Sequence, residues 1–364
     1  MKSIAIFNNK GGVGKTTLTF HLAHALGEMG KKVLIIDLDP QCNFSIYALE
    51  NEAIEQIWEK EEPYIDGFKR SRDYSTSKIF DELVSEHRSV HFLLKPVEEG
   101  IDDLGELPPP VNLTSNIHFL PGRISLHMFE DKLSSRWSDV FVGDDLAIRT
   151  ITSIKALSHK YAKKYAIDVV IFDTSPSLGI LNRTILSMAD GFLIPCNPDL
   201  FSLYGIKNIG RSLNAWSSNF KILQQVLPES RRGLFSDVPV KFLGYTIYKA
   251  QRYAGQNEWD LATGHFNYAQ KIPSMIGDNI GKDIRAPINE DILNMPIGET
   301  AVMHTHQTMA TMSQKYKVPM WEVPNKALDL EDKSTISGNR KRYYDTKERY
   351  IEFAEDLCAR MEAI

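Results

Sequence analysis

Residues 8–17, NNKGGVGKTT, combine glycines, lysines and hydroxyl side chains in a pattern that suits phosphate binding. The three glycines let the backbone curl so that successive N–H groups point at one anion. Lys15 then offers a point charge to the β and γ phosphates, and the Thr16 hydroxyl is placed to complete a Mg²⁺ shell. We therefore predict a nucleotide-binding loop and not a plain glycine-rich turn, with these contacts: Gly11, Gly12, Val13, Gly14, Lys15, Thr16 and, toward the α phosphate, Thr17.

Lys10 is a second lysine in the same loop, and Asn9 stands where the pattern G-x-x-x-x-G-K-[ST] has a glycine. Because Lys15 already occupies the place beside the phosphates, Lys10 either lies in solvent or reaches a nucleotide held by another subunit. The loop alone leaves both interpretations open.

Three aspartates accompany the loop at the ends of apolar runs. Asp37 ends VLIID, Asp39 lies two residues beyond it, and Asp173 closes VVIFD. One carboxylate beside a metal and another that orients a water are what in-line attack on a γ phosphate requires. An aspartate at a strand end also serves as a helix cap or turn former, but the neighbouring loop favours metal support for Asp173.

The elements that must position these residues alternate between short apolar runs and helical stretches. SIAIF (3–7) and VLIID (33–37) are separated by a stretch of helical periodicity that ends in Gly30, which makes a βαβ unit. Further runs of this kind occur at 116–122, 166–177, 191–198 and 240–249. We therefore predict an α/β fold with a doubly wound, mostly parallel sheet flanked by helices.

The domain organisation follows from where this alternation weakens. We expect one nucleotide-binding domain over 1–325, interrupted by a surface insertion at about 45–115 that is partly helical around SKIFDELVSE. Residues 326–345 are polar, which predicts a linker. Residues 346–364 place Tyr350, Leu357 and other apolar side chains on one helical face, so this helix should dock on the domain.

Composition and charge exclude several classes of protein. With 43% apolar and 24% charged residues in 364, no run approaches the roughly 18 apolar residues of a membrane span, and no signal peptide precedes the loop. The net charge of −5 requires any nucleic-acid binding to use a local basic patch. We predict a cytoplasmic protein with no membrane partner.

KGGVGKTT, followed by IIDLDPQCN at 35–43, resembles the deviant Walker A and A′ motifs of the ParA/MinD family of P-loop ATPases. LPGRISLHMFEDKL, DVVIFDTSPSLGILNRTIL and GFLIPCNPDLFSLYGIKNI are similar to ParA segments in the same order. The resemblance implies a P-loop NTPase fold and slow, Mg²⁺-dependent ATP hydrolysis that is stimulated by partners. It also implies the following roles: catalysis by Lys10, Lys15 and Asp39; metal support by Thr16, Asp37 and Asp173; and adenine-side contacts from Pro198, Asp199 and Pro287.

The same resemblance implies that Lys10 crosses the interface of an ATP-dependent homodimer. ParA-like members bind DNA non-specifically to partition a plasmid, a chromosome or another cargo, and a ParB-like adaptor would then be a separate chain, since no helix-turn-helix segment precedes the loop. DNA binding would make the protein nucleoid-associated. The basic residues placed first for this role are Lys249, Arg252, Arg231 and Arg232, although any one of them taken alone is more simply explained as a solvated surface charge.

A different class of function stays open. Where ParA proteins often carry an arginine before a P-x-x-G-like turn, this chain has Glu290 and Asp291, which would repel phosphates. The alternative is a nucleotide-gated dimeric scaffold that recruits a protein partner without binding DNA.

Overall fold

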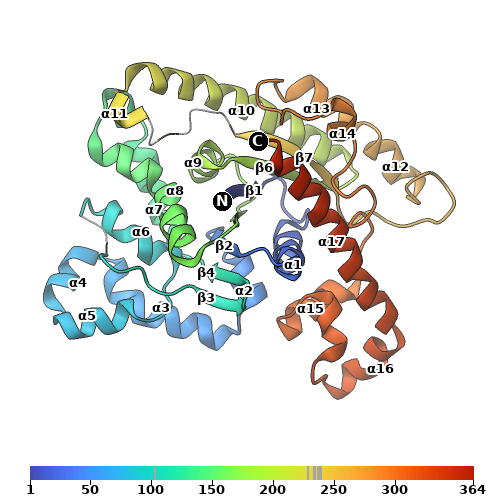
Figure 1. Ribbon diagram of the computed structural model, residues 1–364, viewed down its shortest axis with the longest axis horizontal. Coiled ribbons are helices and arrows are strands. Elements are labelled where there is room, and N and C mark those ends of the chain that lie inside the picture. Colours follow the sequence, from blue (N-terminus) through green and yellow to red (C-terminus); the bar gives the residue numbers. More distant parts are fainter. Residues whose placement is uncertain (102–103, 228, 233–234, 236–239) are drawn as a thin grey trace.

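A seven-stranded sheet of order β3-β4-β2-β5-β1-β6-β7 runs through the protein (Figure 1). The computed structural model describes residues 1–101, 104–227, 229–232, 235 and 240–364, with only the backbone of Gln224, Ser230 and Arg231. All strand pairs are parallel except β3–β4, so the predicted doubly wound, mostly parallel sheet is confirmed. The strands are β1 (Lys2–Ile6), β2 (Val33–Leu38), β3 (Val111–Thr114), β4 (Ile117–Leu120), β5 (Val169–Thr174), β6 (Gly191–Cys196) and β7 (Lys241–Ile247).

Successive residues of the central strands enter two separate cores, because side chains alternate across a sheet. Ile4 and Ile6 of β1 pack in one core, and Ala5 and Phe7 pack in the other. The first core is closed by α1 (Lys15–Glu28), α2 (Asn43–Ala48), α15 (Thr308–Tyr316), η2 (Met320–Asn325), α16 (Leu330–Gly338) and α17 (Arg340–Glu362). The second contains side chains of α6 (Val90–Glu98), α7 (Leu126–Arg136), η1 (Asp139–Val142), α8 (Asp145–Tyr165), α9 (Ile180–Met188), α10 (Leu200–Val226), α12 (Thr263–Ala269), α13 (Ile272–Asn279) and α14 (Glu290–Asn294); α11 (Glu229–Arg232) follows α10.

The insertion at 45–115 is more helical than its composition indicates. Beside the expected helix, α5 (Ser77–Val84), the charge-rich part of the chain forms α3 (Asn51–Ile65) and α4 (Phe68–Tyr74). Tyr64, Phe68 and Phe80 of these helices pack together and join the second core. The strand β3 was not expected, since only two of its residues are partly buried and its polar ones are exposed.

The prediction of a polar linker at 326–345 is wrong. Residues 330–338 form α16, and α17 begins at Arg340, six residues before the expected helix. The segment is polar because these helices expose a charged face, on which Lys315 of α15 bridges Asp329, Glu331 and Asp332. The expected docking of the last helix is seen: Tyr350 and Leu357 are buried, and in Figure 1 the red α17 runs beside α1.

Glu61, a fully buried carboxylate of α3, joins the insertion to the rest of the protein. It accepts hydrogen bonds from the backbone N–H and the hydroxyl of Ser89, both at 2.5 Å, and Arg123 lies 3.5 Å away. Burial raises the pKa of Glu61 to about 7, although the Ser89 hydrogen bonds and Arg123 act in the opposite direction.

We predict that Glu61→Gln removes a pH-dependent destabilisation. The folded-state pKa lies above the unfolded one, so the wild-type carboxylate lowers stability as pH rises from about 4.5 to about 7. The free energy of unfolding of Glu61→Gln, relative to wild type, should therefore increase across that window by up to roughly 3 kcal/mol. Urea unfolding at a series of pH values measures this difference.

The matched control is Glu59→Gln, which removes an exposed carboxylate from the same helix. Its stability relative to wild type should change little with pH because solvent screens the charge. An equal pH dependence in both variants would contradict the role given to Glu61.

Candidate nucleotide and metal site

Asp37 and Asp173 lie side by side at the carboxyl edge of the sheet. They are paired in the parallel register of β2 and β5, and Ile6 of β1 is opposite Asp173 on its other side. Both side chains are fully buried. Burial, followed by the charge of Asp173, raises the pKa of Asp37 to about 8, and burial raises the pKa of Asp173 to about 7. Two carboxyl groups buried so close together are either protonated or neutralised by a cation beside them, so the pair favours cation binding.

Different neighbours hold the two carboxylates. Asp37 Oδ2 accepts hydrogen bonds from the Ser45 N–H at 2.9 Å and the Ser45 hydroxyl at 2.7 Å. Asp173 accepts from the Thr16 hydroxyl at 3.1 Å and the Thr19 hydroxyl at 3.0 Å. The structure thus brings together Thr16 and Asp173, as expected for a metal site, and places Asp37 directly next to them with one oxygen bound to Ser45.

Lys15 is the first residue of α1 and turns into the loop. Its Nζ lies 3.2 Å from the Asn8 carbonyl oxygen and 3.5 Å from that of Lys10. Burial lowers the pKa of this ammonium, while the charges of Asp173 and Asp39 raise it. A Cβ built on Gly11 or Gly12 would meet nothing within 4 Å, so the loop is open above the lysine. A buried cation below an open glycine cradle, with a hydroxyl and carboxylates alongside, fits a nucleotide phosphate and Mg²⁺.

Gly14 is the position where this loop requires glycine. Its φ is +85°, and a Cβ there would lie 2.3 Å from two ring atoms of Tyr248. Tyr248 follows β7 and donates or accepts a hydrogen bond with Tyr350 of α17 at 2.9 Å. The next residue, Lys249, reaches the Gly12 carbonyl oxygen at 3.4 Å. The end of β7 therefore packs against the loop from one side.

Asn8 fixes the other side of the loop. It is fully buried, donates to the Pro195 carbonyl oxygen of β6 at 2.7 Å, and accepts from the Lys10 N–H at 2.9 Å. These two hydrogen bonds tie the loop to the neighbouring strand and set the direction in which Lys10 leaves the backbone.

Lys10 points away from Lys15 and pairs with Asp199, the N-cap of α10. Its ammonium also lies 5.7 Å from the ring centre of Phe201, whose side chain is 73% exposed. Partial burial raises the pKa of Asp199, but the hydrogen bond from Lys10, the hydrogen bond from the Ser202 N–H and the charge of Lys10 together lower it below its usual value. Nearby, three buried polar atoms have no hydrogen-bond partner within the part of the chain that the structure describes: Asn9 Oδ1, Asn197 Oδ1 and Ser202 Oγ.

Asp39 lies beyond the end of β2 with its carboxylate nearly buried. One oxygen accepts from the Gln41 N–H at 2.9 Å and the other from the Asn43 side chain at 3.0 Å. A carboxylate oxygen can accept two hydrogen bonds, and each oxygen of Asp39 accepts one here, so both can still accept a hydrogen bond from a water molecule.

The three residues predicted to contact the adenine lie in two different places. Pro198 and Asp199 follow β6 at the carboxyl edge, where Asp199 contacts the loop through Lys10. Pro287 is exposed and follows Ala286, whose N–H donates to Phe242 near the amino end of β7. The structure does not bring Pro287 to the phosphate loop.

Comparison with known proteins gives the same family as the motifs. The family AAA_31, described as an AAA domain, matches residues 1–224. The sporulation initiation inhibitor protein Soj of Bacillus subtilis is 27% identical over 209 residues, which are 57% of this chain and 63% of Soj. The chain belongs to the ParA/MinD family of P-loop ATPases.

Two solved structures extend the likeness of this ParA/MinD-family chain over most of its length. Protein DIP2308 of Corynebacterium diphtheriae has a TM-score of 0.59 and 28% identity, covering 78% of this chain and 89% of its own. A structure of pNOB8 ParA bound to nonspecific DNA has a TM-score of 0.52 and covers 99% of this chain and 98% of its own, but at 17% identity it supports the fold alone.

The four basic residues predicted to touch DNA lie in different surroundings. Lys249 is exposed beside the loop, and Arg252 pairs with Asp260 at 3.3 Å. Arg232 donates to the Leu227 carbonyl oxygen at 2.8 Å, and the side chain of Arg231 lies outside the described residues.

None of the helices that the structure describes has the length and apolar character needed to cross a membrane.

Sequence reasoning did not assign a role to Asn8, Ser45, Gly122 or Tyr248. Gly122 donates its N–H to the Ser45 hydroxyl, and a Cβ there would lie 2.9 Å from Asp37. Asn8 stands inside the motif and could have been noticed from its position before the loop. The others come from separate segments, and the chain offers no local signal that they meet.

We predict that Gly14→Ala lowers ATP affinity by at least about tenfold, because the added methyl group displaces Tyr248 and the positive φ is strained. Titration with a fluorescent ATP analogue measures the loss. Gly30→Ala is the matched control: its φ is +80°, but nothing lies within 4 Å of the added Cβ. Gly30→Ala should lose about 1 kcal/mol of stability from the strained φ alone and retain ATP affinity. Unchanged ATP affinity in Gly14→Ala would disprove this role of the contact.

Proposed function

We propose that this chain is a Mg²⁺-dependent ATPase of the ParA type, in which ATP joins two copies through Lys10 and the dimer holds DNA to position a cargo. The observation that carries the proposal is that the two lysines of the loop point to different places. Lys15 alone turns into the phosphate cradle, whereas Lys10 leaves it along the rim. A cation on the rim is available to a nucleotide in a facing subunit.

The residues at the sheet edge suit hydrolysis in the following way. Thr16, Asp173 and Asp37 would hold Mg²⁺, which neutralises phosphate charge when bound. Lys15 and the loop N–H groups hold the β and γ phosphates in place. Asp39 orients a water through the free lone pairs of its carboxylate. Lys10 of the second copy supplies positive charge where negative charge develops on the phosphate in the transition state.

Release of Lys10 from Asp199 is the step that couples ATP to dimerisation in this proposal. Within one copy, the ion pair holds the ammonium over Phe201. A nucleotide in the facing copy offers several negative charges in place of one carboxylate. Lys10 would then exchange Asp199 for phosphate, and hydrolysis would return it.

A cluster of basic residues beside the loop is the proposed DNA-binding surface. Burial lowers the pKa of His304, and the nearby guanidinium groups of Arg252 and Arg349 contribute to this. Arg342 lies 3.5 Å from Gln307, and Lys249 reaches the loop itself. These cations come from the end of β7 and from α17.

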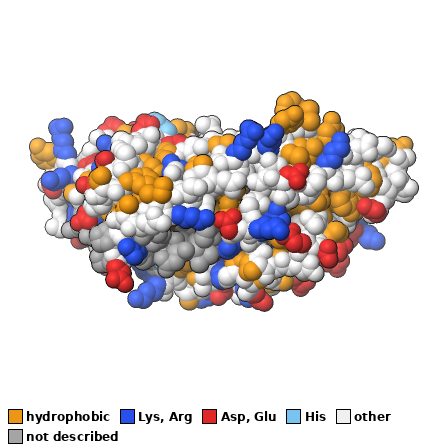
Figure 2. All heavy atoms as spheres, turned by 90° about the horizontal axis from the view of Figure 1, so that it is seen from above, with side chains coloured by type: hydrophobic (Ala, Val, Ile, Leu, Met, Phe, Trp, Pro, Cys, Tyr) orange, Lys and Arg blue, Asp and Glu red, His pale blue; other side chains and the backbone are white. Residues whose placement is uncertain are grey.

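The face seen in Figure 2 is a weaker candidate for DNA. It includes α10 and α13, where blue and red side chains are interspersed and no continuous basic field is visible. Lys221 pairs with Asp283 at 3.5 Å. Arg285 Nη1 donates to both carboxylate oxygens of Glu290 at 3.0 Å. These carboxylates neutralise cations that DNA would need.

A nucleotide-gated scaffold without DNA is the second candidate. The Arg285–Glu290 and Arg252–Asp260 pairs favour it, because they reduce the free positive charge. In either case we propose a cytoplasmic homodimer that a separate ParB-like adaptor connects to its cargo. If the dimer binds DNA, it is also nucleoid-associated.

We predict opposite effects of two substitutions on ATP-dependent dimerisation. Lys10→Ala should prevent the dimer while leaving ATP affinity of the single copy nearly unchanged. Asp199→Asn keeps the cap of α10 but removes the charge that holds Lys10, so the dimer should form at a several-fold lower ATP concentration. Light scattering during an ATP titration measures both. A Lys10→Ala protein that dimerises like wild type would refute the crossing of Lys10.

We predict that DNA retention requires ATP and falls steeply with salt. Arg342→Ala combined with Arg349→Ala should weaken binding to any duplex and reduce the slope of log K against log salt by about two. The control pair is Lys271→Ala with Lys282→Ala, which removes two exposed cations near α13 and should leave the slope unchanged. The absence of ATP-dependent retention even at low salt would favour the scaffold.

A further inference from the structure

β3 forms one end of the sheet, and among the described residues it pairs only with β4. No other segment of the described chain hydrogen-bonds to its outer edge. An open strand edge presents backbone N–H and C=O groups in the spacing that another extended chain can complete. This edge belongs to the insertion, to which the proposed ATPase function assigns no role.

A hollow of about 590 Å³ runs along this edge. All four residues of β3 line it, although consecutive side chains of a strand point to opposite faces. Only the edge of the strand can present four consecutive residues to one hollow. The facing walls are Leu49, which follows α2, and Ala53 of α3, together with Phe20 and His24 of α1 and residues 317–319.

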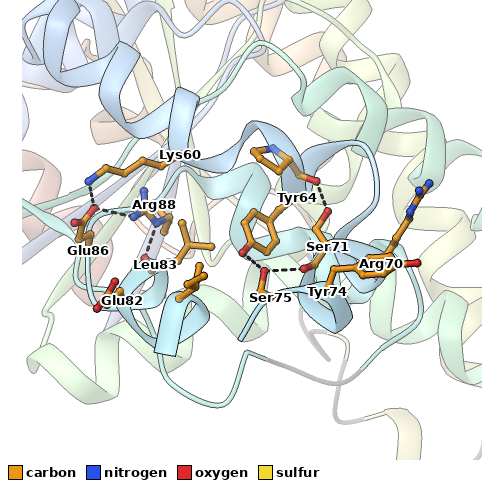
Figure 3. Close-up of a pocket in the computed structure, with 12 residues that line it drawn as sticks. Lys60, Tyr64, Arg70, Ser71, Tyr74, Ser75, Glu82, Leu83, Glu86 and Arg88 are labelled. Atoms are coloured by element: carbon orange, nitrogen blue, oxygen red, sulfur yellow. Dashed lines mark hydrogen bonds and ion pairs between the residues drawn. The ribbon is translucent and has the colours of Figure 1, made fainter. Parts of the chain in front are cut away.

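Two more hollows continue the first along α3. One of about 450 Å³ shares Leu49, Ala53 and Val111 with it. Another of about 610 Å³, drawn in Figure 3, shares Lys60, Glu86 and Arg88 with the second. We call the three together the α3 groove.

The far end of the α3 groove combines apolar and basic groups. Tyr64 and Leu83 line it from the core side, and the rim carries Tyr74 and Ile79, which are 82% and 54% exposed. Figure 3 shows Glu86 held between Lys60, at 2.5 Å, and Arg88, at 2.9 Å. One carboxylate is thus shared by two cations.

Arg70 is the cation of this rim without an ion pair in the described chain. Its guanidinium lies 5.9 Å from the ring centre of Tyr74, and the side chain is exposed. Lys60, Arg70 and Arg88 outnumber the two carboxylates that line this end, Glu82 and Glu86. The groove therefore ends in a small excess of positive charge beside an exposed aromatic ring, which is complementary to an acidic group.

We propose that the α3 groove binds an extended segment of a partner protein, which adds as a strand to β3 and places an acidic side chain at Arg70. From Ala53 to Tyr64, α3 spans about 17 Å, or about five residues of extended chain. With about four more residues along β3, the segment has about nine. A helix would leave the edge of β3 unpaired, and α3 stands beside the edge where the sheet of a folded second copy would have to approach.

The test uses the full-length protein and a display library of random peptides of about ten residues. Selection should enrich sequences that alternate apolar and polar residues and end in Asp or Glu. A synthetic peptide of this kind should slow amide hydrogen exchange of residues 111–114 by at least about tenfold. No enrichment, selection of helical peptides, or exchange unchanged at β3 would overturn the proposal.

Two variants place the peptide in the groove. Ala53→Arg, which fills the point where two hollows meet, should weaken binding of that peptide at least about tenfold. Asn51→Arg adds the same charge at an exposed position of α3 outside the groove and should leave binding unchanged. Arg70→Ala should weaken binding and reduce its salt dependence.

The remaining outcomes also decide the question. Unaltered binding by Ala53→Arg would place the peptide elsewhere and overturn the proposal. Association of the protein with itself that is lost in Ala53→Arg would show that a second copy is the occupant, which also overturns it. Thermal unfolding of the variants confirms that each is folded.

Discussion

The parallel register that places Asp37 beside Asp173 is the constraint on which the site depends. Two fully buried carboxylates destabilise each other, and burial together with their mutual repulsion raises the pKa of Asp37. The fold tolerates this pair because hydroxyl and backbone donors surround it and because Lys15 lies close enough to interact with Asp173. The same arrangement leaves two carboxyl groups next to an open cradle of N–H groups. That combination attracts a metal cation and a phosphate together.

The C-terminal helices are connected to this site by aromatic and imidazole side chains. Tyr248, which packs on Gly14, hydrogen-bonds to Tyr350, and Tyr350 to His306. His21 donates through Nδ1 to the Thr17 carbonyl oxygen and accepts through Nε2 from the Met320 N–H. Burial lowers the pKa of His21 to about 4, so the ring is neutral and keeps this tautomer. The segment after residue 300 thus supports the loop and the start of α1.

The parts of the structure that were predictable are those encoded locally. Gly11 to Thr17, with the apolar runs on either side, specify a strand, a loop and a helix, and the alternating pattern specifies a parallel sheet. Helices α3 and α16 were not predicted because their polarity reflects exposure of one charged face. Tyr350 meets the loop region only through Tyr248, by packing of segments distant in sequence. The ion pair between Lys10 and Asp199 was not predictable either, since Asp199 is 189 residues away and its sequence context is that of an ordinary helix cap.

The lysine pair in the loop gains its meaning from these distant contacts. Asn8 fixes the backbone before Lys10, Tyr248 and Lys249 cover one side of the loop, and α10 approaches so closely that a Cβ on Gly205 would lie 2.9 Å from Asn9 Oδ1. Within this frame Lys15 has one direction available, into the cradle, and Lys10 has the other, along the rim. Three buried polar atoms on the side of Lys10 and Asp199, those of Asn9, Asn197 and Ser202, have no hydrogen-bond partner among the described residues. Since such atoms are costly to leave unpaired, this rim is the part of the site that gains most when a ligand or a second subunit arrives.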